Sequence, residues 1–399
     1  MSDLVVSSEE INWETGLYEC LEGAFAEAVA CGGYAKGYFS SLGEYLRDRF
    51  YFPLKGKSFN LFIQNSKAYA EAFVKKLQGK NPHPERVFPR FEEIREKFDI
   101  KDVPITIRVG DRIFHFTTRI VESKDQFFDR KLRFVLFSFY DHMERKGEKL
   151  GNWDPKSTDE LSGAVLEVLK QVQTKFQVDS LMTFSIGNIV LDGLKNLELQ
   201  EGKKILPKNI IVNRGLTSIE KVSNMLFDYP ISRLLYYGAC LLQLNADPEQ
   251  ELLNFFERLS QDHPSSLEGR SVRIIEMSHD CYFAGLSGFG KEYHKKLSQT
   301  GVESYRGTFF VPGFDEKAHH SLPMHLIPTG GPGAHNEHFP QCEEGETLAD
   351  HLMRTSLFSA KGGEHTLFMA GGNLDNLDSI TCLQVAPFLS SFVRLSKSC

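Results

Sequence analysis

Short apolar runs alternate with helix-forming segments between residues 130 and 280, and few folds accommodate this order. Each run has the length of a buried strand and is too short for a buried helix. Strands that are separated by helices pair in parallel, because each crossover helix returns the chain to the same end of the sheet. We therefore predict an α/β fold with a mostly parallel, twisted sheet flanked by helices. The expected strands are LRFVLFSFY (132–140), SLMTF (180–184), KNIIVN (208–213) and SVRIIEMS (271–278).

The segment ITIRVGDRIFHFTTRIV, residues 105–121, alternates apolar and polar residues around a central Gly-Asp pair. This pattern predicts a β-hairpin. Residues 12–100 instead show apolar residues at helical spacing. Ser157 and Glu160 form a capping-box pattern ahead of an apolar helical stripe, which predicts a helix that begins there and packs on the sheet.

These patterns divide the chain into three predicted regions. Residues 1–102 form a helical N-terminal region, residues 103–339 form the α/β core, and residues 340–399 form a C-terminal extension packed on that core. Within the core, residues 214–270 are largely helical and too long for a plain connection between two strands. We predict that they form an inserted helical lid.

The composition of the chain limits the classes of function that it can have. The net charge of −7 gives no basic surface, which argues against nucleic acid as a partner. The 32 phenylalanines indicate a large core or an apolar pocket. The seven cysteines are odd in number and include no Cys-x-x-Cys pair, so we expect reduced thiols.

The sequence predicts neither a signal peptide nor a membrane-spanning helix. The start, MSDLVVSSEEINWE, has neither the basic nor the apolar region of a signal peptide. The longest apolar run, ISRLLYYGACLLQL, is too short and interrupted to span a bilayer, so we expect no transmembrane segment. These features predict a cytoplasmic protein, or one that is exported without a cleavable signal.

The text FVLFSFYDHMERKGEKLGNWDPKSTDELSGAVLEVLK, followed by SLMTFSIGN, resembles the α/β-hydrolase superfamily. The overall sequence pattern of the chain is similar to that of divergent hydrolases of intracellular pathogens, the SidB-type secreted effectors and the chlamydial CHLPS-type proteins. The resemblance implies a nucleophilic serine on a sharp strand-to-helix turn, written Gly-x-Ser-x-Gly. Here the turn is Thr183-Phe184-Ser185-Ile186-Gly187. Ser185 is thus either that nucleophile or an ordinary serine at a strand–helix junction.

The resemblance also implies an acid and then a histidine after the serine. Asp280, which follows the strand VRIIEMS, is the candidate acid, and its alternative role is a turn or helix cap. For the base we prefer His335, in the glycine-rich GGPGAHNEH, with His320 as the alternative. An imidazole takes the proton of the serine hydroxyl, and the carboxylate orients that imidazole and stabilises its charged form.

The oxyanion that forms during acyl transfer needs preorganised donors. The resemblance implies the backbone N–H of Ile186 as one donor, and Tyr140, in the loop after an earlier strand, as the region of the second. The His-Gly or Gly-Gly text typical of that loop is absent there. The predicted function is a serine esterase, lipase or thioesterase that acts on a small acyl substrate, lipids included, and needs no cofactor. The alternative is a binding or effector protein that kept the fold and lost turnover.

Other chemistries have weaker support in the sequence. HNEH, residues 335–338, has the spacing of two zinc ligands, but no His-Glu-x-x-His is present and glycines and prolines surround it. Cys281 could be a nucleophile, although a buried small residue is its simpler interpretation. The glycine-rich segments 285–292 and 329–335 lack the Gly-Lys-Ser/Thr ending of a P-loop. We predict neither a metal nor a nucleotide site.

Overall fold

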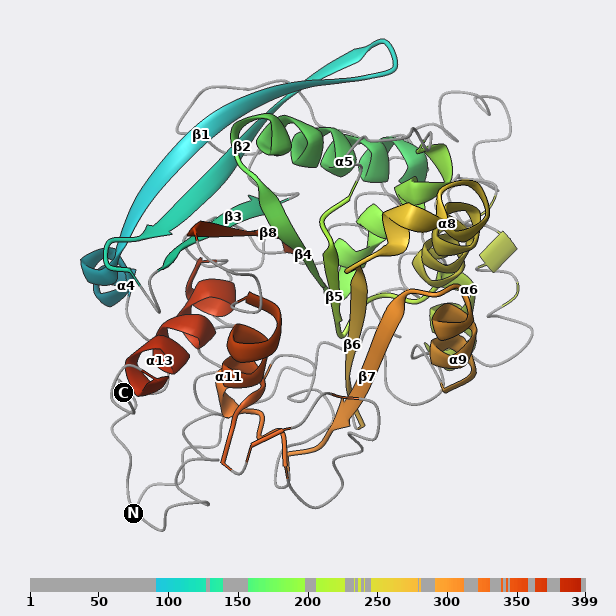
Figure 1. Ribbon diagram of the computed structural model, residues 1–399. Coiled ribbons are helices and arrows are strands. Elements are labelled where there is room, and N and C mark those ends of the chain that lie inside the picture. The colour runs from blue at the N-terminus through green and yellow to red at the C-terminus, as the bar shows by residue number, and fades with distance from the viewer. Residues whose placement is uncertain are drawn as a thin grey trace, which may run out of the picture.

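A computed structural model of the chain contains a single sheet of eight strands in the order β1-β2-β3-β8-β4-β5-β6-β7, with helices on both faces (Figure 1). The structure describes residues 91–126, 130–138, 157–197, 206–226, 233, 236–237, 240, 245–278, 280, 291–311, 322–330, 339, 342–343, 345–357, 363–371 and 381–395. The strands are β1 (Phe98–Val109), β2 (Arg112–Ser123), β3 (Arg130–Ser138), β4 (Val178–Phe184), β5 (Asn209–Asn213), β6 (Ser271–Met277), β7 (Glu303–Phe309) and β8 (Gly363–Gly371).

The sheet combines two kinds of pairing. β1, β2 and β3 pair antiparallel, and every pair from β3 through β8 and β4 to β7 is parallel. The predicted hairpin is present, because Val109 pairs with Arg112 and Gly110 turns the chain with φ +58°. The predicted α/β class, with a mostly parallel sheet flanked by helices, is therefore confirmed.

The helices follow the capping and spacing signals of the sequence. In α5 the side chain of Ser157 accepts a hydrogen bond from the Glu160 N–H, as the capping pattern predicts. The described helices are α4 (Phe91–Lys97), α5 (Thr158–Lys175), α6 (Ile219–Leu226), α8 (Pro248–Asp262), α9 (Lys291–Gln299), α11 (Leu348–Leu352) and α13 (Ala386–Leu395). Shorter 3₁₀ segments are η2 (Ser185–Asn196), η3 (Pro264–Leu267) and η4 (Met324–Leu326), and π-helical turns are η5 (Met353–Leu357) and η6 (Thr381–Val385).

Two apolar cores cover the two faces of the sheet. One contains the buried residues of α5, η2, α8 and α9, and the other those of α4, η4, α11 and α13. Neighbouring strand residues belong to opposite cores, as Leu181 and Met182 of β4 do, because side chains alternate along a strand. Figure 1 shows α5, α8 and α9 on one side of the sheet and α11 and α13 on the other.

The C-terminal region is not an extension of a finished core. β8 lies in the middle of the sheet and pairs in parallel with β3 on one side and with β4 on the other (Figure 1). Its residues Leu367, Phe368, Met369 and Ala370 are at most 1% exposed. The predicted core boundary at residue 339 is therefore wrong, because a central strand comes from residues beyond it.

The segment 214–270 also differs from the prediction. Its helix α8 connects β5 to β6 and buries Leu252, Leu253, Phe255, Phe256 and Leu259 in the core that covers η2. α8 is therefore a crossover helix of the core, and most of the predicted lid between residues 227 and 244 lies outside the described residues. At the other end of the chain, α4 is helical as expected, but β1 begins at Phe98, where the sequence predicts helix up to residue 100. The rest of the predicted helical region, residues 12–90, lies outside the described residues.

Candidate functional site

The candidate site lies at the carboxyl edge of the parallel strands. Ser185 directly follows the end of β4, Arg214 directly follows the end of β5, and Asp280 comes shortly after the end of β6. The carboxyl ends of parallel strands meet at the same edge, so the fold brings these three residues of distant sequence together. β5 separates β4 from β6, and two strand spacings amount to about 10 Å.

Ser185 has a backbone conformation that is rare for its residue type. Its φ is +53°, and Ser185 and Arg214 are the two non-glycine residues with positive φ in the described part of the chain. Phe184 before it is extended, and η2 begins at Ser185 itself. Such a conformation costs about 1–3 kcal/mol and occurs preferentially at functional sites. The turn also leaves the serine only partly buried, whereas Thr183 and Asn188 beside it are fully buried.

Thr183 stands where the hydrolase pattern has glycine, and the structure shows how the turn accommodates it. The Thr183 hydroxyl donates to Asn188 Oδ1 at 2.7 Å, on the buried side of the turn. Asn188 was not expected from the sequence. The only signal available there was an asparagine three positions after the serine.

Arg214 is a second residue that sequence reasoning missed. Its side chain is buried, with Nε donating to Asn213 Oδ1 at 3.0 Å and Nη1 donating to the Leu322 carbonyl at 2.7 Å. The guanidinium lies 5.0 Å from the centre of the Phe184 ring. Burial lowers the pKa of Arg214 to about 10, against the opposing attraction of Asp280. An arginine directly after the buried strand NIIVN was the available signal.

Asp280 is 2% exposed and lines a small depression together with Arg214 and Glu276. Its backbone N–H donates to the Met277 carbonyl at 3.2 Å, which closes a turn after β6. The carboxylate thus lies at the predicted edge of the sheet, and a buried guanidinium shares its surroundings.

The other predicted site residues have less structural description. Tyr140, His320, His335 and the side chain of Ile186 lie outside the described residues. Topology nevertheless bears on Tyr140, because its strand β3 is separated from β4 by β8. β8 and β5 are the strands beside β4, and Ala370 of β8 pairs with Thr183; the placement of Tyr140 itself stays a prediction.

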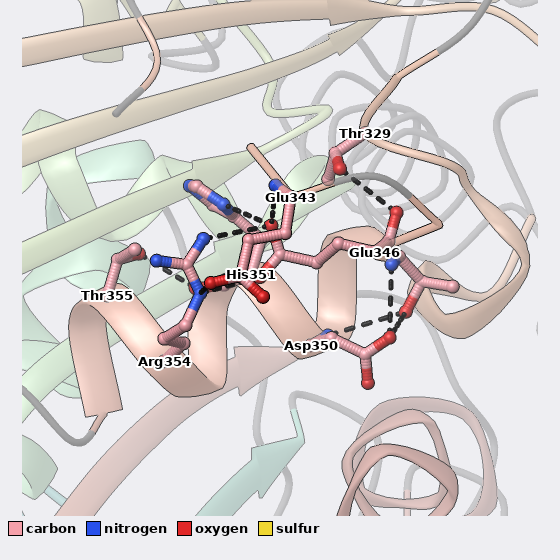
Figure 2. Close-up of polar contacts among 8 residues, drawn as sticks. Thr329, Glu343, Glu346, Asp350, His351, Arg354 and Thr355 are labelled. Atoms are coloured by element: carbon pink, nitrogen blue, oxygen red, sulfur yellow. Dashed lines mark hydrogen bonds and ion pairs between the residues drawn. The ribbon is translucent and has the colours of Figure 1, made fainter. Parts of the chain in front are cut away.

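A group of potential metal ligands lies elsewhere, where Cys342, Glu346 and His351 come within 4.8 Å of one another. The Glu346 carboxylate is already used: it accepts from His351 Nδ1 at 3.0 Å, from Arg354 Nε and Nη2 at 2.9 and 3.0 Å, and from the Glu343 N–H at 3.0 Å (Figure 2). Three of these donors bond Oε2 and the fourth bonds Oε1, so both carboxylate oxygens are already engaged. A cation would also lie beside the charge of Arg354, so this donor set does not suit a metal.

The network around Glu346 instead joins α11 to the loop before it. Burial alone would raise the pKa of Glu346, but its bonds to Arg354 and His351 outweigh that effect and hold the pKa below its usual value. Burial lowers the pKa of His351, so its ring is neutral near pH 7. The two histidines of the HNEH segment, His335 and His338, lie outside the described residues.

No model of a known protein family matches the chain, and no curated protein sequence does. Among solved structures, an esterase of Pyrococcus furiosus is similar over 54% of this chain and 83% of its own, with 12% identity and a TM-score of 0.32. An esterase of the fungus Rhizomucor miehei is similar over 62% of this chain and 88% of its own, with 14% identity and a TM-score of 0.29. TM-scores this low support no inference about this chain.

None of the described helices combines the length and apolar character that crossing a membrane requires.

Proposed function

We propose that this protein is a serine hydrolase that cleaves an ester or thioester bond, with Ser185 as the nucleophile. One observation carries the proposal: Ser185 has a φ of +53° at a strand-to-helix turn on the carboxyl edge of a central parallel strand. A turn of this kind presents a hydroxyl at the edge of the sheet, where a base and a substrate can reach it.

The proposed acid is Asp280. The separation of β4 and β6, about 10 Å, leaves room for an imidazole between the serine and the carboxylate. A carboxylate offers about four acceptor positions, so Asp280 can accept a hydrogen bond from an imidazole while it also attracts the guanidinium of Arg214. The proposed bases are His335 and His320. The Leu322 carbonyl accepts a hydrogen bond from Arg214 at this edge of the sheet, and His320 is only two residues before Leu322 in the sequence. His320 should therefore be tested alongside His335.

For the oxyanion we propose the backbone N–H of Ile186 and a second donor at the carboxyl end of β8. β8 is the direct neighbour of β4, whereas the strand before Tyr140 is one position further away. β8 ends at Gly371, and Gly372 follows it in the sequence; glycine has no side chain to hinder the approach of a ligand to its N–H. A Gly-Gly pair, which is missing from the loop after β3, is thus present at the end of β8.

A fluorophosphonate probe tests the proposal, because it reacts with an activated serine. We expect labelling of the wild-type protein, loss of labelling in Ser185→Ala, and full labelling in Ser265→Ala, which changes an exposed serine of η3. With the best substrate from a panel of p-nitrophenyl esters and acyl thioesters, Ser185→Ala should lower turnover by about 10⁴-fold. Substitution of the true base, His320→Gln or His335→Gln, should abolish labelling as well.

The second candidate function is a binding protein that lost turnover. The buried Arg214 beside Asp280 favours it, because that carboxylate already has a cationic neighbour. Absence of labelling in the wild-type protein would support this alternative. Persistent labelling of Ser185→Ala would show instead that another residue is the nucleophile.

A further inference from the structure

The conformation of Ser185 requires an explanation, because a residue with left-handed φ persists only where its surroundings hold it there. Glycine is tolerated in such turns because it has no Cβ to clash. This turn carries Thr183 in place of the first glycine of the hydrolase pattern, so the chain must hold the turn in another way.

A closed series of hydrogen bonds surrounds the turn. Thr183 Oγ1 donates to Asn188 Oδ1 at 2.7 Å, and Asn188 Nδ2 donates to the Leu216 carbonyl at 2.6 Å. The Leu216 N–H in turn donates to the Ser185 carbonyl at 3.1 Å. These bonds connect Thr183, two residues before the serine, to Leu216 in the loop after β5, and Leu216 is in turn bonded to Ser185.

Burial and packing make the series rigid. Thr183 and Asn188 are both 0% exposed, so water does not compete for their bonds. A Cβ built on Gly215 would lie 2.7 Å from Asn188 Cγ and 2.8 Å from Val212 Cγ1. The side chain of Asn188 therefore rests directly on the backbone of the β5 loop and has no space in which to shift towards Gly215.

Among the described residues, the Thr183 hydroxyl has one other acceptor within reach, the Ile211 carbonyl at 3.5 Å. The shorter distance to Asn188 makes Asn188 the principal partner. The hydroxyl also orients the amide, because only Oδ1 can accept its proton, and Nδ2 is then directed at Leu216.

We propose that Thr183 and Asn188 are positioning residues that hold the Ser185 turn in its reactive conformation. This inference rests on the proposed function, since it assigns them a role in the reactivity of Ser185. Neither residue touches the substrate. Their bonds fix the backbone from which the hydroxyl projects, and a small displacement of a nucleophile is sufficient to slow attack.

The test compares two substitutions at one position. Thr183→Val keeps the shape and removes the hydroxyl, whereas Thr183→Ser keeps the hydroxyl. We measure the maximal inactivation rate and the binding constant for a fluorophosphonate separately. Thr183→Val should lower the maximal rate about tenfold or more and leave the binding constant unchanged, because a buried hydrogen bond is lost behind the nucleophile and not in the binding site. Thr183→Ser should stay within about threefold of the wild-type rate.

Asn188→Asp provides a second variant, because it keeps the acceptor for Thr183 and removes the donor to Leu216. It should show the same selective loss of rate. Wild-type rates in both Thr183→Val and Asn188→Asp, or loss of folding in both by circular dichroism at 10 °C, would overturn the positioning role. An unlabelled wild-type protein would instead refute the proposed function, so the two failures are distinguishable.

Discussion

The position of β8 makes a strong prediction about Phe368. This side chain is 0% exposed and belongs to the core on the α5 and α8 side of the sheet. Its backbone pairs with Val135 of β3 and with Leu181 of β4. If residues 340–399 were a peripheral extension, truncation of one side chain there would have little effect. In the observed fold Phe368→Ala opens a cavity in the middle of the sheet.

The expected size follows from core truncations in other proteins. Phe→Ala at a fully buried site costs about 3–5 kcal/mol of unfolding free energy. With a urea dependence of about 3 kcal/mol per molar, a value for a large domain, the unfolding midpoint should fall by about 1–1.7 M. Ile113→Ala is the matched control, because Ile113 is 59% exposed near the tip of the β1–β2 hairpin. It should lower the midpoint by less than about 0.3 M.

Urea titrations followed by far-ultraviolet circular dichroism measure both variants against the wild-type protein. Equal midpoint shifts for Phe368→Ala and Ile113→Ala would refute the central position of β8. A truncation that ends at Leu357 gives an independent check, since it removes β8 and α13 together. We expect that truncated chain not to fold, because β3 and β4 would lose their shared partner.

Three further predictions concern α8, Arg214 and His351. Phe256→Ala on α8 should destabilise the protein by about 3–5 kcal/mol in urea titrations, because the side chain is 1% exposed, whereas a lid residue would alter activity and leave stability unchanged. Arg214→Met should cost about 3–5 kcal/mol, and a double-mutant cycle with Asp280→Asn should show a coupling above about 1 kcal/mol; additive effects would contradict their interaction. The pKa of His351 is lowered in the folded state, so the unfolded chain binds its proton first as the pH falls from 7 to 5 and stability is lost over that range. His351→Gln should therefore show a smaller fall in melting temperature between pH 7 and pH 5 than the wild-type protein, and an equal fall would contradict the lowered pKa.

The positions of two candidate site residues, Ser185 and Asp280, at the ends of strands could be predicted from the sequence. Ser185 lies between an apolar run and a helical pattern, and both signals are local, so its place at the end of a strand could be predicted. Asp280 follows a predicted strand for the same reason. The partners Asn188 and Arg214 could not be predicted, because their roles depend on contacts with Leu216 and Leu322, which come from other loops. Local spacing contains no information about such contacts.

The sequence by itself determined the elements: the hairpin around Gly110, the capped helix after Ser157, and the apolar strands of a parallel sheet. Turn residues, caps and side-chain periodicity act over a few residues, so their effects can be predicted without knowledge of the rest of the chain. Only the tertiary structure decided the strand order, in which β8 separates β3 from β4, and the role of α8 as a core helix. An apolar segment is buried favourably against any complementary surface, so its hydrophobicity does not specify which distant strands it joins. That choice follows from packing the whole chain at once.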